Sequence, residues 1–582
     1  MKRLFKVLLL CSTYNSMTQR FYAELSYLGH EVSCIIASSK EAMQEVESTL
    51  NFIRPEVIIA PFLKIAIPKS IWEKFRCLIV HPGIKGDRGA SSLDWAILNN
   101  WSNWGVTILE ASEEWDAGNI WAFESFKIEG ESKSILYREK CAQAAIKATV
   151  KALEHLATEG YQPEPLNYSR PDVKGSWNPL MKQSVRRIDW QNDSTEVIVR
   201  KIRCSDSQPG VLDDLGLDVG DFYLYGAHPE SMFVGTKPRE IIGQRYGAIC
   251  LSTVDGAVWV SHLRRKDSFK LPAMLVLKPL IAKSILENIH EISAPTSFSE
   301  WETFREIWYE EKNGVGYLHF DFYNGAMGTE QCNRLREEYL NARVRDTKVI
   351  VLMGGNFFSN GIHLNLIEAA SDPRLESWRN INAMNDLILE ILRTDDHLTI
   401  AALQGNAAAG GVMLALACDQ VFARNGVVLN PHYKKMGLFG SEYWTYSLPR
   451  RVGVEMATQL TQACQPIIAS EAVSINLINN CFGETTAEFR ELVVQRAEEM
   501  ARDNFDDSLR IKNHRRFLDE QYRGSLQEYR ERELDQMKID FASFAYNIGR
   551  NNFVYKKGQP CTSFLINSKR RELGRDLVSI GI

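Results

Sequence analysis

The sequence has little that marks a membrane, secreted or nucleic-acid-binding protein. No stretch approaches the roughly 18 consecutive apolar residues that a membrane-spanning helix needs. The apolar run near the N-terminus lasts only from Val7 to Cys11, and no small-residue cleavage site of a signal peptide follows it. With 68 Lys and Arg against 73 Asp and Glu, the net charge is −5, so the basic excess typical of nucleic-acid binding is missing. These absences predict a cytoplasmic protein without membrane or nucleic-acid partners.

The sequence also lacks the patterns of two other kinds of site: cysteine pairs for disulfides or metals, and a glycine-rich loop for a dinucleotide. The 11 cysteines include no Cys-x-x-Cys pair, so we expect reduced thiols, no disulfide framework and no metal. The first expected strand-to-helix turn, CSTYNSMTQR, contains no glycine. That weighs against the glycine-rich phosphate cradle of NAD and FAD enzymes.

The 582 residues are too many for one hydrophobic core, and the pattern changes along the chain. Short apolar runs at 5–11, 32–37, 56–60 and 77–80 alternate with helical segments. Continuous apolar strands of this kind predict a parallel sheet covered on both faces. We expect this first domain to span residues 1–170.

The rest of the chain predicts two more domains. Short strands separated by turn residues indicate a small β-domain, in the form of a barrel, over 171–275. The polar stretch EISAPTSFSE (291–300) is the best candidate for a linker, which we place at 276–311. A second α/β pattern follows, and residues 312–582 are expected to form a third domain that ends in charged helices. The predicted fold class is a multidomain α/β protein.

The first candidate site is the loop HPGIKGDRGASS at 81–92. His81 follows an expected strand at the carboxyl end of a parallel sheet, where open α/β folds bind ligands. A second loop, within 105–122, presents Glu113, Glu114 and Asp116. A histidine beside a carboxylate can act as an acid–base pair. From these residues alone, a histidine that merely ends a strand in a turn is the more common alternative.

Residues 1–270 resemble the folate-dependent formyltransferases, through the ordered stretches PEVIIAPFLKIAIPKSIW, HPGIKGDRGASS and GVTILEASEEWDAGNIW. The resemblance implies a formyltransferase fold, 10-formyltetrahydrofolate as cofactor, and His81 and Asp116 as the catalytic pair. It places the cofactor-binding loop at Gly83, Arg88, Gly89 and Ala90. The family's Asn-x-His signature is altered, because Ile79 stands in the place of the asparagine. We therefore expect a different formyl acceptor or a shifted oxyanion site.

The second candidate site lies in GGNFFSNGIHLNLIE and ALQGNAAAGGVMLALACD. Gly410 and Gly411 open an apolar helix, whose first backbone N–H groups have no partner within the helix. Alone, a Gly-Gly pair here is better explained by close packing against a strand. The two stretches together resemble the crotonase (enoyl-CoA hydratase/isomerase) superfamily over roughly 312–560, which implies a crotonase fold that binds coenzyme A.

The crotonase resemblance implies an oxyanion hole with donors at Ile362 and Gly410. It places further coenzyme A contacts at Asn360, Gly361, Leu364 and Gly411. The two glutamates of hydratases are missing, since Met413 stands at the first position and Tyr433 near the second. Hydration of an enoyl thioester is therefore not expected.

The stretch NPHYKKMGLFGSEYWTY supplies other polar groups for this second site. We predict catalytic roles for Tyr433 and Glu442, with His432 nearby. Tyr446 fits a packing role as well as a catalytic one.

A formyltransferase joined to a crotonase-like domain resembles, over the whole chain, a family of maturation proteins of nickel–iron hydrogenases. This implies formyl transfer to coenzyme A, then decarbonylation of formyl-CoA to carbon monoxide for the hydrogenase iron. It also implies contact with the hydrogenase maturation machinery. Two alternatives stay open: a formyltransferase for a sugar or aminoacyl amine with a regulatory CoA-binding domain, and a non-catalytic scaffold that senses folate and CoA. If the protein makes carbon monoxide through formyl-CoA, we expect both sites to open onto one internal cavity.

Overall fold

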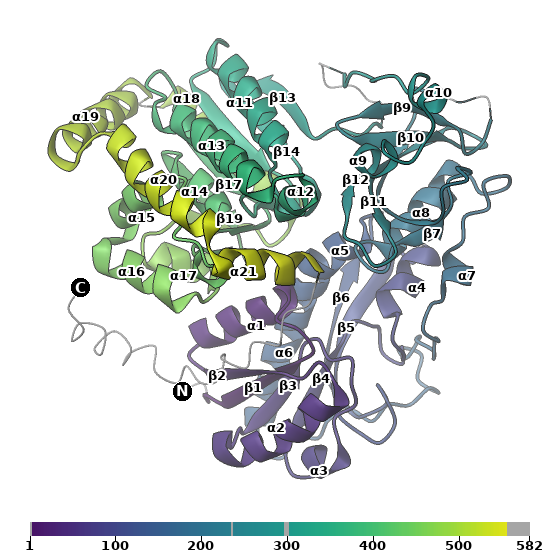
Figure 1. Cartoon of the computed structure of the whole chain (residues 1–582). Helices are drawn as coiled ribbons and strands as arrows, with labels where there is room; N and C mark the ends of the chain where they lie inside the picture. The colour runs from purple at the N-terminus through teal and green to yellow at the C-terminus, as the bar shows by residue number, and fades with distance from the viewer. Residues whose placement is uncertain (1–2, 234, 236, 296–301, 504, 556–582) are drawn as a thin grey trace.

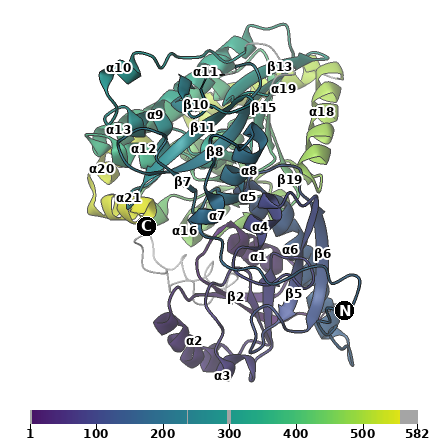
Figure 2. The ribbon, with the colours of Figure 1, turned by 90° about the vertical axis from the view of Figure 1, so that its right-hand side faces the viewer.

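The computed structural model describes residues 3–233, 235, 237–295, 302–503 and 505–555. These residues form three domains, and the first domain lies below the other two in both views (Figures 1 and 2). Within the described ranges, no helix combines the length and apolar character needed to cross a bilayer. The expected multidomain α/β architecture is confirmed.

The first domain is built on a six-stranded sheet in the order β2-β1-β3-β4-β5-β6. Its strands are β1 (Lys6–Cys11), β2 (Glu31–Ile36), β3 (Val57–Ala60), β4 (Cys77–His81), β5 (Asn103–Glu110) and β6 (Ile120–Lys127). The expected parallel arrangement is confirmed for β1 to β4, whereas β5 and β6 are added antiparallel. The carboxyl end of β4 is therefore followed by a loop at the same edge as the ends of β1 and β3.

Helices cover both faces of this sheet, which is why its central strands are apolar throughout. Val7 and Leu9 point into one core, and Leu8 and Leu10 point into another. The helical elements of the domain are α1 (Ser16–Tyr27), α2 (Lys40–Ile53), α3 (Lys69–Trp72), α4 (Ser92–Leu98), α5 (Lys133–Leu136), the π-helix η1 (Tyr137–Cys141) and α6 (Ala142–Ala157). Apolar residues of α1 and α6 line the first core, and those of α2 line the second.

The small domain is an antiparallel sheet in the order β7-β8-β11-β10-β9, with β12 paired to β11. Its strands are β7 (Val211–Asp213), β8 (Phe222–Glu230), β9 (Ile241–Arg245), β10 (Ala248–Ser252), β11 (Ala257–Arg265) and β12 (Leu271–Pro272). Its helices are α7 (Gln183–Arg186), α8 (Thr195–Ser205), α9 (Ala273–Leu277) and α10 (Lys283–Leu286). Among the described residues β7 and β9 do not pair, so the expected barrel is an open one.

The third domain begins with β13 (Ile307–Lys312), inside the stretch expected as a linker. The same stretch holds α10, and its residues 296–301 lie outside the described part of the chain. The main sheet continues with β14 (Val315–Phe320), β15 (Val349–Gly354), β17 (Leu398–Leu403), β19 (Gln420–Arg424) and β22 (Asn480–Phe482). A second, smaller sheet is formed by β16 (Phe357–Ser359), β18 (Asn406–Ala408), β20 (Val428–Asn430) and β21 (Ile467–Ile468).

Helices surround these two sheets, and the described part of the third domain ends in a helical segment as expected (Figure 1). They are η2 (Tyr323–Gly325), α11 (Thr329–Arg343), α12 (Leu364–Ala369), α13 (Pro373–Leu392), α14 (Gly410–Leu416), η3 (Lys434–Met436), α15 (Trp444–Val452), α16 (Val454–Ala463), α17 (Ala469–Ser474), α18 (Thr486–Arg502), α19 (Phe505–Arg523), α20 (Leu526–Ala542) and α21 (Phe544–Tyr555). Met537 and Phe541 of α20 and Tyr546 of α21 belong to the main core of the domain. The C-terminal helices are thus part of the fold.

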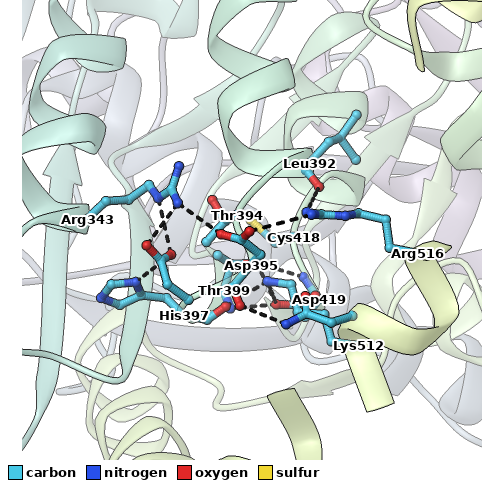
Figure 3. A network of polar contacts seen from close by, with 12 residues as sticks. Arg343, Leu392, Thr394, Asp395, His397, Thr399, Cys418, Asp419, Lys512 and Arg516 are labelled. Atoms are coloured by element: carbon cyan, nitrogen blue, oxygen red, sulfur yellow. Dashed lines mark hydrogen bonds and ion pairs between the residues drawn. The ribbon is translucent and has the colours of Figure 1, made fainter. Parts of the chain in front are cut away.

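A polar network attaches α19 to the edge of this domain (Figure 3). The Lys512 ammonium donates to the His397 carbonyl at 2.7 Å and pairs with Asp419 at 2.8 Å. On the other side of the same loop, Arg343 pairs with Asp396 at 2.9 Å. Because α19 has no fully buried side chain, these charged contacts carry much of its attachment.

The three domains meet through buried side chains. The Tyr323 hydroxyl donates to Asp206 of the small domain at 2.7 Å, and its ring stacks on His262 at 4.2 Å. The Arg138 guanidinium, from η1 of the first domain, lies 4.3 Å from the ring centre of Phe357 in β16. The Tyr323 contacts thus join the third domain to the small domain, and the Arg138 contact joins β16 to the first domain.

Candidate functional site

The two loops predicted for the first site lie against each other. Arg88 donates to the Trp115 carbonyl at 3.0 Å and pairs with Glu114 at 2.7 Å. The N–H of Gly89 donates to Asp116 at 3.2 Å. As a result His81, the last residue of β4, lies with Nδ1 3.6 Å from Oδ1 of Asp116. The structure thus brings the proposed pair together across two loops.

A second carboxylate, Asp87, is closer to His81 than Asp116 is. Its Oδ2 lies 2.9 Å from Nε2 of His81, and its side chain is almost fully buried. Sequence reasoning missed this residue, although it stands beside Arg88 in the loop already selected. The sequence does carry a signal for it: Asp87 and Arg88 are adjacent charged residues in the loop that directly follows the strand ending at His81.

These partners control the charge of His81. Burial alone would lower the pKa of His81, but the hydrogen bond that His81 donates to Asp87 and the charges of Asp116 and Asp87 outweigh burial and raise it. The imidazolium form therefore persists to higher pH than in a free histidine. A buried cationic histidine between two carboxylates can donate a hydrogen bond to an oxygen that becomes negative.

The residues predicted to bind cofactor in this loop have structural roles of their own. A side chain on Gly83 would overlap the His81–Asp87 pair, and one on Gly89, whose φ is +112°, would overlap the Asn178 carbonyl. Arg88 joins the two loops, as described above, while Ala90 is exposed. Cofactor contacts of these four residues stay predictions.

The second site is centred on a close approach of two backbone segments. A Cβ on Gly361 would lie 3.2 Å from the backbone nitrogen of Gly410, so the segment holding Ile362 lies beside the start of α14. Gly410 is the first residue of α14, and its N–H has no acceptor within that helix. The two predicted oxyanion donors therefore come from adjacent segments. The assignment of the donors stays a prediction.

The neighbouring predicted residues fix these segments in place. Asn360 donates through its side chain to the Asn324 carbonyl at 2.7 Å. Leu364 is the first residue of α12, and a side chain on Gly411 would overlap the Ser359 carbonyl. Gly411 thus allows α14 to pack on β16, which is the close-packing role considered for the glycine pair.

Glu442 is the ionisable group that lies directly at Gly410. A side chain on Gly410 would overlap its carboxylate, and the residue is 2% exposed. Burial raises the pKa of Glu442 to about 8; the charge of Glu533 adds to this, whereas hydrogen bonds from Tyr433 and the Ser441 N–H oppose it. Burial also raises the pKa of Tyr433 well above 10, so its hydroxyl stays protonated. Such an acid–base pair in a closed site is typical of enzyme active sites.

The other polar candidates of this stretch lie differently. Tyr446 packs at a ring distance of 5.3 Å on Tyr529 and contacts Arg450, so its packing role is the one supported. His432 is half-buried, and burial lowers its pKa to about 4, which keeps it neutral. Met413 is fully buried and offers no base. Glu533 of α20, which sequence reasoning missed, reaches the Glu442 turn from a helix some ninety residues later in the chain.

Comparison with known proteins agrees with this division. The formyl transferase family matches residues 7–153, the formyl transferase C-terminal domain matches 180–278, and the enoyl-CoA hydratase/isomerase family matches 311–561. The class of protein is therefore a formyltransferase fused to a crotonase-like domain.

Relatives share the whole fusion. The hydrogenase maturation factor HoxX of Bradyrhizobium diazoefficiens is 41% identical over 97% of each chain. A crystal structure of HypX from Aquifex aeolicus in complex with tetrahydrofolic acid is 43% identical over 96% of this chain and 97% of that one, with a TM-score of 0.89. A crystal structure of a doubly substituted variant of the same HypX is 42% identical over 97% of this chain and 98% of that one, also with a TM-score of 0.89. The chain belongs to the HypX/HoxX family of hydrogenase maturation factors.

The charge of His81 gives a first testable prediction. Asp87→Asn removes the acceptor charge at Nε2, so the NMR titration midpoint of His81 should move to lower pH. In the unmodified protein the contribution of His81 to the free energy of unfolding is complete below about pH 6.5, the unfolded value, and is lost as pH rises through the higher folded pKa. Asp87→Asn should remove most of this pH dependence. Asp346→Asn, an exposed site, serves as the control, and an unchanged His81 midpoint in Asp87→Asn would contradict the assignment.

Proposed function

We propose that this protein makes carbon monoxide in two steps: formyl transfer from 10-formyltetrahydrofolate to coenzyme A, then decarbonylation of formyl-CoA. The observation that carries the proposal is the buried Glu442 at Gly410, in a crotonase-like site without the bases of a hydratase. Such a site holds a thioester carbonyl and a base but lacks the pair of groups that activates water. The tetrahydrofolic acid bound to the related HypX supports the folate half of the proposal.

In the first step the thiol of coenzyme A attacks the formyl carbon, and the carbon–nitrogen bond to the folate breaks. The thiol proton passes to the folate nitrogen, which leaves tetrahydrofolate and formyl-CoA. His81 stabilises the oxyanion through Nδ1–H, because Nε2 is held by Asp87 and Nδ1 lies at the longer distance from Asp116. A thiol, with an ordinary pKa near 8.5, is easier to activate than an amine. This fits the replacement of the family's asparagine by Ile79.

In the second step Glu442 removes the formyl proton of formyl-CoA. The electron pair of the C–H bond forms carbon monoxide as the carbon–sulfur bond breaks, and the thiolate leaves. Protonation of the thiolate regenerates coenzyme A. The N–H groups of Ile362 and Gly410 bind the thioester oxygen, and Tyr433 donates a hydrogen bond beside Glu442. Water is neither consumed nor released in this step.

The intermediate passes between the sites inside the protein. A chain of contacts supports this route: Phe62, which follows β3, touches Tyr137 of η1, and the next residue, Arg138, covers Phe357 beside the second site. At the carboxyl edge of the first sheet these contacts join the domain of His81 to the domain of Ile362. Formyl-CoA reacts with water, so a closed passage protects it. A flexible pantetheine arm gives its thiol a high local concentration at both ends.

Headspace gas analysis tests the first step. Purified protein given 10-formyltetrahydrofolate and coenzyme A should release carbon monoxide, and His81→Ala should lower that rate by about 10²-fold, the share of one oxyanion donor. The same variant should still convert added formyl-CoA. His514→Ala, an exposed histidine on α19, is the control. Wild-type rates in His81→Ala, or formylation of an amine with no gas released, would overturn the assignment.

Glu442 gives the prediction for the second step. Glu442→Gln should slow release of carbon monoxide from added formyl-CoA by about 10²–10⁴-fold, with coenzyme A affinity nearly unchanged, because a positioned base is lost. A base acts in its ionised form, so the unmodified rate should rise with pH through about 8.

Two results would argue against this role of Glu442. One is hydration of crotonyl-CoA by the unmodified protein, which would mean that the site activates water. The other is a flat pH profile between pH 6 and 9, the range around the raised pKa of about 8.

Isotope labelling tests passage between the sites. ¹³C-labelled 10-formyltetrahydrofolate, coenzyme A and an excess of unlabelled formyl-CoA are supplied together. Internal transfer predicts that the first carbon monoxide released carries ¹³C far above its share of the free formyl-CoA pool. Full dilution into that pool would show release of the intermediate to solvent.

A further inference from the structure

The turn that carries Glu442 has a backbone conformation that needs outside support. Glu442 and Tyr443 have φ values of +61° and +58°, in the left-handed region that side chains with a Cβ rarely adopt. Two consecutive residues of this kind persist only where surrounding contacts fix them. The direction in which Glu442 points therefore depends on the groups that bind this turn.

Most of that support comes from one side chain, Glu533 of α20. Its Oε2 accepts hydrogen bonds from the N–H of Tyr443 at 2.9 Å and from the Ser441 hydroxyl at 3.4 Å. Its Oε1 accepts from the N–H of Thr445 at 2.8 Å and from the Thr445 hydroxyl. Glu533 is completely buried, so these donors replace its hydration.

Asn385 of α13 completes the support of the turn. Its side-chain oxygen accepts from the N–H of Glu442 at 2.9 Å, and its amide donates to the Ser441 hydroxyl at 2.9 Å. Asn385 is neutral, however. Among the described residues, the titratable side chains that face Glu442 are Tyr433 after β20, Cys332 of α11 and Glu533 of α20. Burial raises the pKa of both Tyr433 and Cys332, so Glu533 is the neighbour that can be anionic near neutral pH.

We propose that Glu533 is a positioning residue of the second site, which fixes the Glu442 turn against Gly410 and places a second carboxylate beside Glu442. The inference rests on the proposed function, because it concerns the base of the decarbonylation step. It also assigns the C-terminal helical segment a part in that site. Burial raises the pKa of Glu533 itself to about 7, against the effect of its four donors, and the charge of Glu533 adds to the effect of burial in raising the pKa of Glu442.

The test compares three variants by the pH dependence of carbon monoxide release from added formyl-CoA. Glu533→Gln keeps the size of the side chain but removes its charge and one acceptor. The midpoint of the pH profile should move to lower pH by about one unit, the coupling expected of a buried carboxylate pair. The kcat should fall about 10-fold or more through misplacement of Glu442, while KM changes little.

Glu533→Asp separates charge from placement. The charge remains while the carboxylate is withdrawn by one methylene, so kcat should fall with the midpoint near its original value. The matched control is Asp540→Asn. Asp540 lies on the same helix and accepts from the N–H of Phe439 in the same loop, at 2.6 Å, but it does not touch the Glu442 turn. The variant Asp540→Asn should leave the midpoint of the pH profile unchanged.

The outcomes decide the proposal. An unmoved midpoint in Glu533→Gln, or an equal shift in Asp540→Asn, overturns it. If Glu533→Gln fails to fold, Thr445→Val removes one donor to Glu533, which weakens the anion and should move the midpoint in the same direction by less. An unmoved midpoint in that variant overturns the proposal as well.

A second readout separates this proposal from the proposed function. The protonated-carboxyl infrared band of Glu442, identified by its loss in Glu442→Gln, can be titrated without any substrate. If no variant and no unmodified protein releases carbon monoxide, the proposed function fails. The role of Glu533 is then decided by whether Glu533→Gln moves this infrared titration to lower pH.

Discussion

Both sites of this protein depend on one constraint: an ionisable group that is buried must find partners or give up its charge. In the first domain Asp87 and Asp116 lie at the two ring nitrogens of His81 and raise its pKa in spite of burial. In the third domain Glu442 has a weak opposing set of donors and the like charge of Glu533 nearby, so it holds a proton up to about pH 8. The same physical rule thus favours the charged form of a histidine in one domain and the protonated form of a carboxyl group in the other.

This constraint also explains the departures from the two parent folds. The formyltransferase asparagine is replaced by Ile79, and the nearest polar partner of His81 is now Asp87. The first hydratase glutamate is replaced by the buried Met413, and a carboxylate enters at Gly410 from a later loop instead. A fold therefore gives the place for chemistry, and the charged residues decide which chemistry it is.

The third domain supports its site with parts that are distant in the sequence. Gly361 and Gly410 meet because β16 and β18 pair in parallel within the small sheet. The Glu442 turn is held from α13 and α20, and α19 is attached to the main sheet by Lys512. The hydrogen bond from Tyr323 to Asp206 then fixes this domain against the small domain. Each of these contacts joins elements from different stretches of the chain.

The sequence alone determined the features that are local or that depend on the order of motifs along the chain. The apolar runs of β1 to β4, the glycine-rich loop after His81 and the paired crotonase stretches follow from neighbouring residues, so the fold and the family were predictable, while the roles of the site residues stay predictions. Asp87 and Glu533 were not recognised. Asp87 acts only because its loop folds back onto His81, and Glu533 only because α20 packs against a turn that precedes it by about ninety residues. The charge of His81 and of Glu442 was likewise decided by tertiary structure, because a pKa follows burial and the distance to other charges, and neither is encoded in the spacing of residues along the chain.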